Sequence, residues 1–142
     1  MTTLSNNQTL QPYLFFSGRC EEAIEFYRHA LDAKVEMMMR FKDSPDQSSV
    51  PPGAGDNIMH ATFHVGSATL MASDGCPGEK TAFEGFGLSL TVPSESEATR
   101  FFNALAEGGT VRMPLSKTFY SPCFGMVADR FGLLWMLMVP FA

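Results

Sequence analysis

The sequence lacks an excess of basic residues and has no long apolar run. Lysine and arginine number 10 against 15 aspartates and glutamates, which gives a net charge of −5 at pH 7. This balance argues against a nucleic-acid partner, because such a partner needs a basic face. No apolar run approaches the ~20 residues that span a bilayer. Residues 1–9 lack the basic start and apolar centre of a signal peptide. We therefore expect a cytoplasmic protein with no membrane contact.

Cysteine is scarce and is poorly placed for cross-linking. Cys20, Cys76 and Cys123 are odd in number, widely spaced and without a C-x-x-C pair. We therefore expect neither a disulfide scaffold nor a zinc ribbon. We expect each cysteine to pack as a small, partly buried apolar residue.

The sequence contains an internal repeat. Glu22-Ala23-x-x-Phe26-Tyr27 returns as Glu97-Ala98-x-x-Phe101-Phe102, an offset of 97 − 22 = 75 residues. Each copy lies in a predicted helix that follows an apolar strand. With 142 residues, of which 45% are hydrophobic, the chain fits one domain. We expect a single domain over residues 1–142, with modules at 10–74 and 86–139 joined by a linker at 75–85.

The order of elements predicts an α+β fold in which two βαβββ modules form a curved mixed sheet around one pocket. The helices are expected near 19–31 and after the capping box Ser94-x-x-Glu97. The predicted strands cover residues 10–16, 34–41, 57–65 and 68–74 in the first module and 86–92, 110–118, 123–129 and 133–139 in the second. The segment 42–56 is rich in Ser, Pro, Gly and Asp and is expected to be a loop.

The hairpin around Gly66-Ser67 separates an apolar face from a polar one. A two-residue turn places Val65 opposite Ala68, and side chains then alternate along both strands. One face is wholly apolar and should pack on a helix. The other face carries His60, Thr62, His64, Thr69, Met71 and Ser73. Small polar groups interspersed with methionine are typical of a pocket of mixed polarity. The alternative is the solvated face of an antiparallel sheet.

The second module offers fewer polar candidates for the same pocket. Ser89 shares the pocket face of its strand, and Met136 lies on the corresponding side of the last strand. Phe119 precedes Ser121-Pro122, where it could form an aromatic wall over the pocket or pack in the core. Asp129, before Arg130-Phe131-Gly132, is expected to be a turn residue.

His60 is the candidate catalytic residue. Its ordinary pKa suits a general acid or base near neutral pH, and the hydroxyl of the facing Ser73 could orient it. The alternative is a histidine that bonds a neighbour and stabilises the sheet. A Ser73–His60–Asp74 triad is excluded, because adjacent strand residues point to opposite faces. His60 and His64 lie roughly 13 Å apart along one strand, too far to bind one ion together.

Several motifs together resemble a known family. They are Glu22-Ala23-Ile24-Glu25-Phe26-Tyr27, Asp129-Arg130-Phe131-Gly132-x-x-Trp135, Pro12-Tyr13-Leu14-x-Phe16-x-Gly18, Met59-His60-Ala61 and Met71-x-Ser73-Asp74. The pattern resembles the PhnB-like branch of the vicinal oxygen chelate superfamily, which includes glyoxalases, extradiol dioxygenases and bleomycin-resistance proteins. Members are often labelled as a 3-demethylubiquinone-9 3-methyltransferase domain. The chain has no glycine-rich strand-to-helix turn to hold S-adenosylmethionine, so methyl transfer is not expected.

The resemblance also implies where a metal would bind and how the chain assembles. Metal-dependent members place ligands at positions that correspond here to Pro12 or Gln11, Met71, Gly87 and Met136. Proline and glycine offer no ligand, and a thioether suits the family's divalent ions poorly. No cofactor is expected, although a divalent metal is not excluded. The resemblance implies a homodimer.

These observations lead to one expected function and two alternatives. We expect a small-molecule-binding protein or a metal-independent enzyme of this family, with Thr62, His64, Met71, Ser89, Met136 and Phe119 at the ligand. A metal-dependent lyase or dioxygenase with a rearranged site is one alternative. A protein that sequesters its ligand without turnover is the other.

Overall fold

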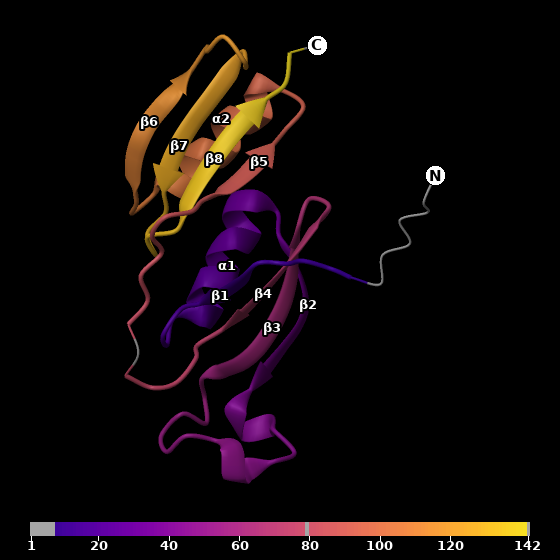
Figure 1. Ribbon diagram of the computed structural model, residues 1–142, viewed down its shortest axis with the longest axis vertical. Coiled ribbons are helices and arrows are strands. Elements are labelled where there is room, and N and C mark those ends of the chain that lie inside the picture. The colour runs from indigo at the N-terminus through magenta and orange to yellow at the C-terminus, as the bar shows by residue number, and fades with distance from the viewer. Residues whose placement is uncertain (1–7, 79, 142) are drawn as a thin grey trace. The chain divides into compact units, whose positions relative to one another are not determined.

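The computed structural model describes residues 8–78 and 80–141 (Figure 1). The first module contains β1 (Tyr13–Phe15), α1 (Cys20–Leu31), β2 (Lys34–Arg40), β3 (Ile58–Val65) and β4 (Ala68–Ser73). Two short 3-10 helices, η1 (Phe41–Asp43) and η2 (Gln47–Ser49), interrupt the connection between β2 and β3. The second module contains β5 (Leu88–Thr91), α2 (Glu95–Ala106), β6 (Thr110–Ser116), β7 (Cys123–Ala128) and β8 (Leu134–Val139).

Each module forms its own four-stranded mixed sheet with the same topology. The strand orders are β1-β4-β3-β2 and β5-β8-β7-β6. In both sheets the first strand pairs in parallel with the last, and the other neighbours pair antiparallel. The predicted α+β class and the tandem βαβββ modules are therefore confirmed. The first strand is shorter than predicted, since pairing begins only at Tyr13.

The helices form where apolar residues recur on one side. In α1 the predicted stripe is buried: Cys20, Ala23, Ile24 and Tyr27 are fully inaccessible. In α2 the N-cap Ser94 accepts a hydrogen bond from the Glu97 amide at 3.2 Å, as the capping box predicts. Gly108, with φ of 75°, follows the end of this helix.

Contacts divide the chain into two compact units. Among the described residues, one unit comprises residues 8–24 and 33–78, and the other comprises residues 25–32 and 80–141. The boundary falls within α1, so the second half of this helix packs with the second module. Tyr27 shows this packing, because its hydroxyl donates to Asp129 Oδ2 at 2.5 Å.

Asp129 has a larger role than the turn predicted for it. Its Oδ1 accepts the amides of Phe131 and Leu133 at 2.8 and 3.1 Å. Its Oδ2 accepts Tyr27 Oη and the indole N–H of Trp135, the latter at 3.0 Å. This carboxylate therefore joins a turn, a strand and a helix inside the second unit. The four donors offset the cost of burying this carboxylate.

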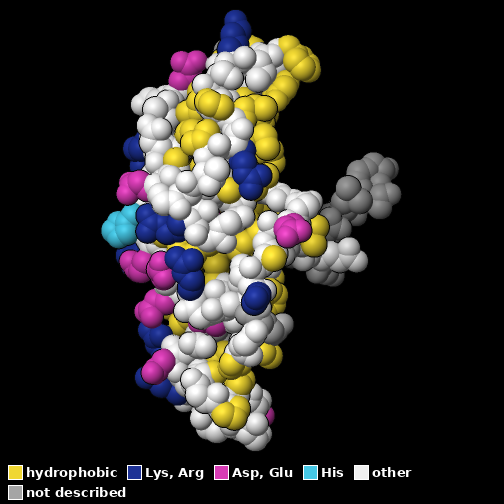
Figure 2. All heavy atoms as spheres, turned by 90° about the vertical axis from the view of Figure 1, so that its left-hand side faces the viewer, with side chains coloured by type: hydrophobic (Ala, Val, Ile, Leu, Met, Phe, Trp, Pro, Cys, Tyr) yellow, Lys and Arg dark blue, Asp and Glu magenta, His cyan; other side chains and the backbone are white. Residues whose placement is uncertain are grey.

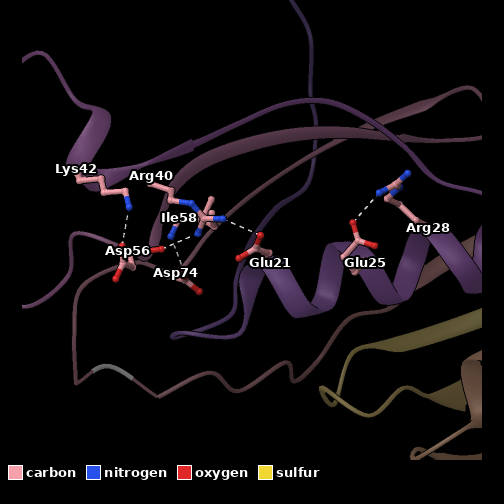
Figure 3. Close-up of polar contacts among 8 residues, drawn as sticks. All are labelled: Glu21, Glu25, Arg28, Arg40, Lys42, Asp56, Ile58 and Asp74. Atoms are coloured by element: carbon pink, nitrogen blue, oxygen red, sulfur yellow. Dashed lines mark hydrogen bonds and ion pairs between the residues drawn. The ribbon is translucent and has the colours of Figure 1, made fainter.

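Ionic contacts attach the β2–β3 connection to the rest of the first unit (Figure 3). Arg40 donates to Glu21 Oε2 at 2.7 Å and to the Asp56 carbonyl at 2.8 Å. Lys42 pairs with Asp56 at 2.9 Å, and this contact lowers the pKa of the Asp56 carboxyl. These contacts therefore hold both ends of the β2–β3 connection beside the first turn of α1.

Candidate functional site

In the first sheet, β3 and β4 pair in the predicted register. His64 lies opposite Thr69, and Thr62 lies opposite Met71. The face carrying Ala61, Phe63, Leu70 and Ala72 is buried, and we call the opposite side of this sheet its open face. A row of paired residues crosses the open face from β1 to β2: Tyr13, Met71, Thr62 and Met37.

His60 lies on this open face with both ring nitrogens occupied. The hydroxyl of Tyr13 is 2.9 Å from Nδ1, and the hydroxyl of Thr62 is 3.2 Å from Nε2. Burial and then the nearby Cys20 raise the pKa of Tyr13, whereas its interaction with Ser73 acts in the opposite direction, so the phenol is protonated at neutral pH. The Tyr13 hydroxyl can donate to Nδ1, and the Thr62 hydroxyl can bond to Nε2. The arrangement can pass a proton along the face.

Tyr13 is a site residue that the sequence analysis missed. Its position follows from the parallel pairing of β1 with β4, which sets Tyr13 beside Met71. Pairing between segments so distant in sequence leaves no local pattern. Once the strand order is known, the alternation of Tyr13, Leu14 and Phe15 places the Tyr13 side chain on the open face.

Ser73 is buried, and its hydroxyl bonds to the backbone at the end of the hairpin. Its hydroxyl donates to the Ile58 carbonyl at 3.3 Å and accepts the Gly75 amide at 2.9 Å. The hydroxyl that lies within hydrogen-bond distance of His60 Nδ1 belongs to Tyr13. Ser73 therefore fixes the end of the hairpin in this structure, and its predicted part in catalysis stays a prediction.

Asp74 binds backbone rather than His60. Its Oδ1 accepts the amides of Gly18 and Cys20 at 2.8 Å each. Its Oδ2 accepts the Ile58 amide at 2.7 Å (Figure 3). The carboxylate thus caps the amino end of α1 from a strand 54 residues away in sequence. It positions α1 against the hairpin that carries His60.

His64 forms a second polar cluster near the edge of the same face. Thr69 Oγ1 is 3.1 Å from its Nδ1, and Glu36 Oε1 is 2.8 Å from its Nε2. Glu36 lies at a register shift in β2, between Val35 and Met37. His64 is thus paired with a carboxylate, whereas the two ring nitrogens of His60 face hydroxyl groups.

The second sheet presents a cavity instead of polar clusters. The corresponding row across its open face, opposite the side where Val127, Trp135 and Leu137 are buried, is Ser89, Met136, Met126 and Met113. A cavity of 520 Å³ lies over this region. Its lining is largely apolar, with two charged side chains: Phe83, Glu84, Gly85, Phe86, Gly87, Arg112, Met126, Gly132, Leu134 and Met136.

Of the second-module candidates, only Met136 lines this cavity. Ser89 is exposed on β5 and lies outside the lining. Phe119 is 94% exposed and stacks edge-on with Tyr120, away from the cavity. The structure adds Arg112 and Met126, which the sequence analysis did not single out.

Potential metal-ligating side chains do not cluster on the open faces of the two sheets in the described part of the chain. Across residues 8–78 and 80–141, no group of three or more His, Cys, Asp or Glu side chains is close enough to hold an ion. Met71 and Met136 offer thioethers at the positions implied by the resemblance, and His60 is bonded to two hydroxyls. These donors fit hard divalent ions poorly. In the same described residues, no helix is both long and apolar enough to cross a bilayer.

Comparison with known proteins gives one matching family model and a curated relative. The model described as 3-demethylubiquinone-9 3-methyltransferase matches residues 8–138. The protein YjdN of Escherichia coli is 33% identical over 138 residues, which cover 92% of this chain and 94% of that protein.

Solved structures share the fold across nearly the whole chain. Protein PA1353 from Pseudomonas aeruginosa is 47% identical with a TM-score of 0.82, over 93% of this chain and 98% of that one. A PhnB protein from Bacillus cereus is 29% identical with a TM-score of 0.77, over 93% and 99%. The fosfomycin resistance protein FosX from Mesorhizobium loti, at 12% identity and a TM-score of 0.62, shares the fold alone, over 94% and 91%.

Proposed function

This chain belongs to the PhnB-like family of the vicinal oxygen chelate superfamily, and we propose that it binds a small, partly apolar molecule. The observation that carries this proposal is the cavity over the second sheet. Its volume of 520 Å³ lies within the range of small-molecule sites. Its walls are mostly apolar, with few polar groups to fix a ligand's orientation.

The methionines support a binding role for the cavity. Met126 and Met136 pair across β7 and β8, and both are only half-buried. Thioether side chains are flexible and polarizable, so they adapt to ligands of irregular shape. A ligand in the cavity would remove this apolar surface from water, at about 25 cal/mol per Å².

Acid–base catalysis without a metal is the second part of the proposal. It is supported by the hydrogen-bonded chain from Tyr13 through His60 to Thr62 on the open face of the first sheet. In this role the imidazole of His60 exchanges a proton with the ligand, and the Tyr13 hydroxyl, 2.9 Å from Nδ1, orients the ring. Thr62, His64 and Met71 lie on the same face and are the proposed ligand contacts there.

Binding is tested with the uncharged fluorophore phenylnaphthylamine, which brightens in an apolar site. We expect saturable binding of one molecule per chain. Met136→Gln should weaken it about tenfold, because an amide replaces an apolar contact. Met113→Gln is the matched control, since Met113 is in the same row but outside the cavity lining. Equal effects of the two substitutions, or no saturable binding, would refute the proposal.

Companion measurements separate the alternatives. Purified protein is analysed for metal, and a stoichiometric ion that is lost in His60→Ala would favour a metal-dependent lyase or dioxygenase. Saturable binding of a metabolite without product would favour sequestration. Binding of S-adenosylmethionine, measured by thermal shift, would favour the methyl transfer that the family description names.

The proposal also includes assembly as a cytoplasmic homodimer. It is supported by large hydrophobic side chains that reach the surface in both units (Figure 2). They include Tyr13 and Phe15 in the first unit and Phe86, Val111 and Met113 in the second. A second copy could cover such surfaces. Light scattering after gel filtration should give twice the mass of one chain, and the mass of one chain would contradict this part.

A further inference from the structure

Each sheet contains a β-bulge at the corresponding place. It lies in the strand that follows the helix of the module, which is β2 in the first module and β6 in the second. In β2, Val35 pairs with Phe63 and Met37 pairs with Thr62, so Glu36 is one extra residue. In β6, Val111 pairs with Val127 and Met113 pairs with Met126, so Arg112 is one extra residue. A bulge turns the extra side chain out of the normal alternation. Both bulges thereby place a charged residue beside the open face.

Among the described residues, the charged residue at the first bulge forms an ion pair and the one at the second bulge does not. Glu36 meets His64 at 2.8 Å, two residues along β3 from Thr62. Met126 corresponds to Thr62 in the matching row, so Ala128 stands where His64 would be. Within residues 8–78 and 80–141, no ion pair includes Arg112. Its side chain instead lines the cavity with Met126 and Met136.

We infer that Arg112 binds the anionic head of the ligand, and that the ligand is an apolar organic acid with one oxyanion group. This inference rests on the proposed binding function of the cavity and specifies its substrate class. A guanidinium presents parallel N–H donors that match the two oxygens of an oxyanion. Phe86, Leu134 and Met136 would contact the apolar body. Glu84, also in the lining, repels a second negative group and so limits the ligand to one.

Two fluorescent probes with the same aromatic body test the inference. Anilinonaphthalene sulfonate carries a single sulfonate, and phenylnaphthylamine is its uncharged counterpart. Arg112→Gln should weaken sulfonate binding about tenfold, because it removes charge-assisted hydrogen bonds, and should change binding of the neutral probe less than about twofold. Glu84→Gln should tighten sulfonate binding. Added salt should weaken sulfonate binding to the unmodified protein and spare the neutral probe.

Lys117→Gln is the matched control. Lys117 is exposed just after β6 and lies outside the cavity lining, so its loss changes the net charge equally. Equal weakening of sulfonate binding by Arg112→Gln and Lys117→Gln would overturn the inference, since net charge would then suffice. Equal weakening of both probes by Arg112→Gln would overturn it too. Saturable binding of the neutral probe with no sulfonate binding would refute the anion site and leave the proposed function standing, whereas binding of neither probe would refute both.

Discussion

The two modules share a strand order but present different chemistry on their open faces. The first sheet carries His60, Thr62, His64 and Thr69, joined into hydrogen-bonded clusters with Tyr13 and Glu36. The second sheet carries Phe124, Met126, Ala128 and Met136 at or near the matching positions. One repeat thus retains groups that can move protons, and the other retains apolar surface around a cavity. The two modules therefore share their backbone topology and differ in the side chains on their open faces.

The modules also differ in how their helices begin. In the second module, Ser94 caps α2 from the residue just before it. In the first module, the cap of α1 is Asp74, which comes from the end of β4. A local cap stabilises one helix, whereas a distant carboxylate couples the helix to the sheet. The start of α1 therefore depends on the tertiary fold, and the start of α2 does not.

The largest expected effect comes from removing the distant cap. Asp74→Asn should lower the free energy of unfolding by about 3 kcal/mol, because a buried carboxylate loses charge-assisted bonds and its amide faces a backbone donor. Ser94→Ala should cost about 1 kcal/mol. Urea denaturation of both variants measures the difference. A cost for Asp74→Asn no greater than that for Ser94→Ala would contradict the coupling.

The next effect concerns the thiol at the start of α1. Burial, followed by the charges of Asp74 and Glu21, raises the pKa of Cys20 above its ordinary value of 9.0. The folded state therefore favours the neutral thiol. Its stabilisation is fully present below about pH 9 and is lost as the pH rises further, by up to about 1.4 kcal/mol per pH unit.

Cys20→Ala tests this pH dependence. Unfolding free energies measured from about pH 8 to about pH 10 should fall more steeply for the unmodified protein than for the variant. Burial also raises the pKa values of Cys123 and Tyr13, but both residues remain in the two proteins. The difference in slope therefore isolates Cys20, and identical slopes would contradict the burial of its thiol.

The smallest effects are expected at the two bulges. Glu36→Gln breaks an exposed pair with His64. Arg112→Gln removes a charge that forms no ion pair with any residue in the described ranges 8–78 and 80–141. Each should change the unfolding free energy by less than about 0.5 kcal/mol. Urea denaturation measures both. A larger loss for Arg112→Gln would mean that this residue supports the fold, and would weaken its assignment to ligand binding.

Local patterns predicted the elements and the faces of their strands. Alternation in the hairpin gave the pairing of Val65 with Ala68 and of Thr62 with Met71. The stripe in α1 and the alternation of Trp135 and Leu137 in β8 match their burial. These features depend on neighbours within a few residues, so periodicity is enough to find them.

Contacts between distant segments could not be predicted in this way. Tyr13 reaches His60 across the strand that separates β1 from β3, and Asp74 reaches the start of α1. Arg112 joins the cavity because a bulge breaks the alternation on which the prediction relied. Each case depends on strand order or register, which no single segment encodes.

By itself, the sequence determined the two-module α+β topology and the polar character of one hairpin face, since both follow from the periodicity and spacing of side chains. Tertiary structure decided which groups became partners: Tyr13 for His60, Asp74 for α1, and the cavity for Arg112. The physical reason is that hydrogen bonds and ion pairs act over a few ångströms in space, whatever the distance along the chain.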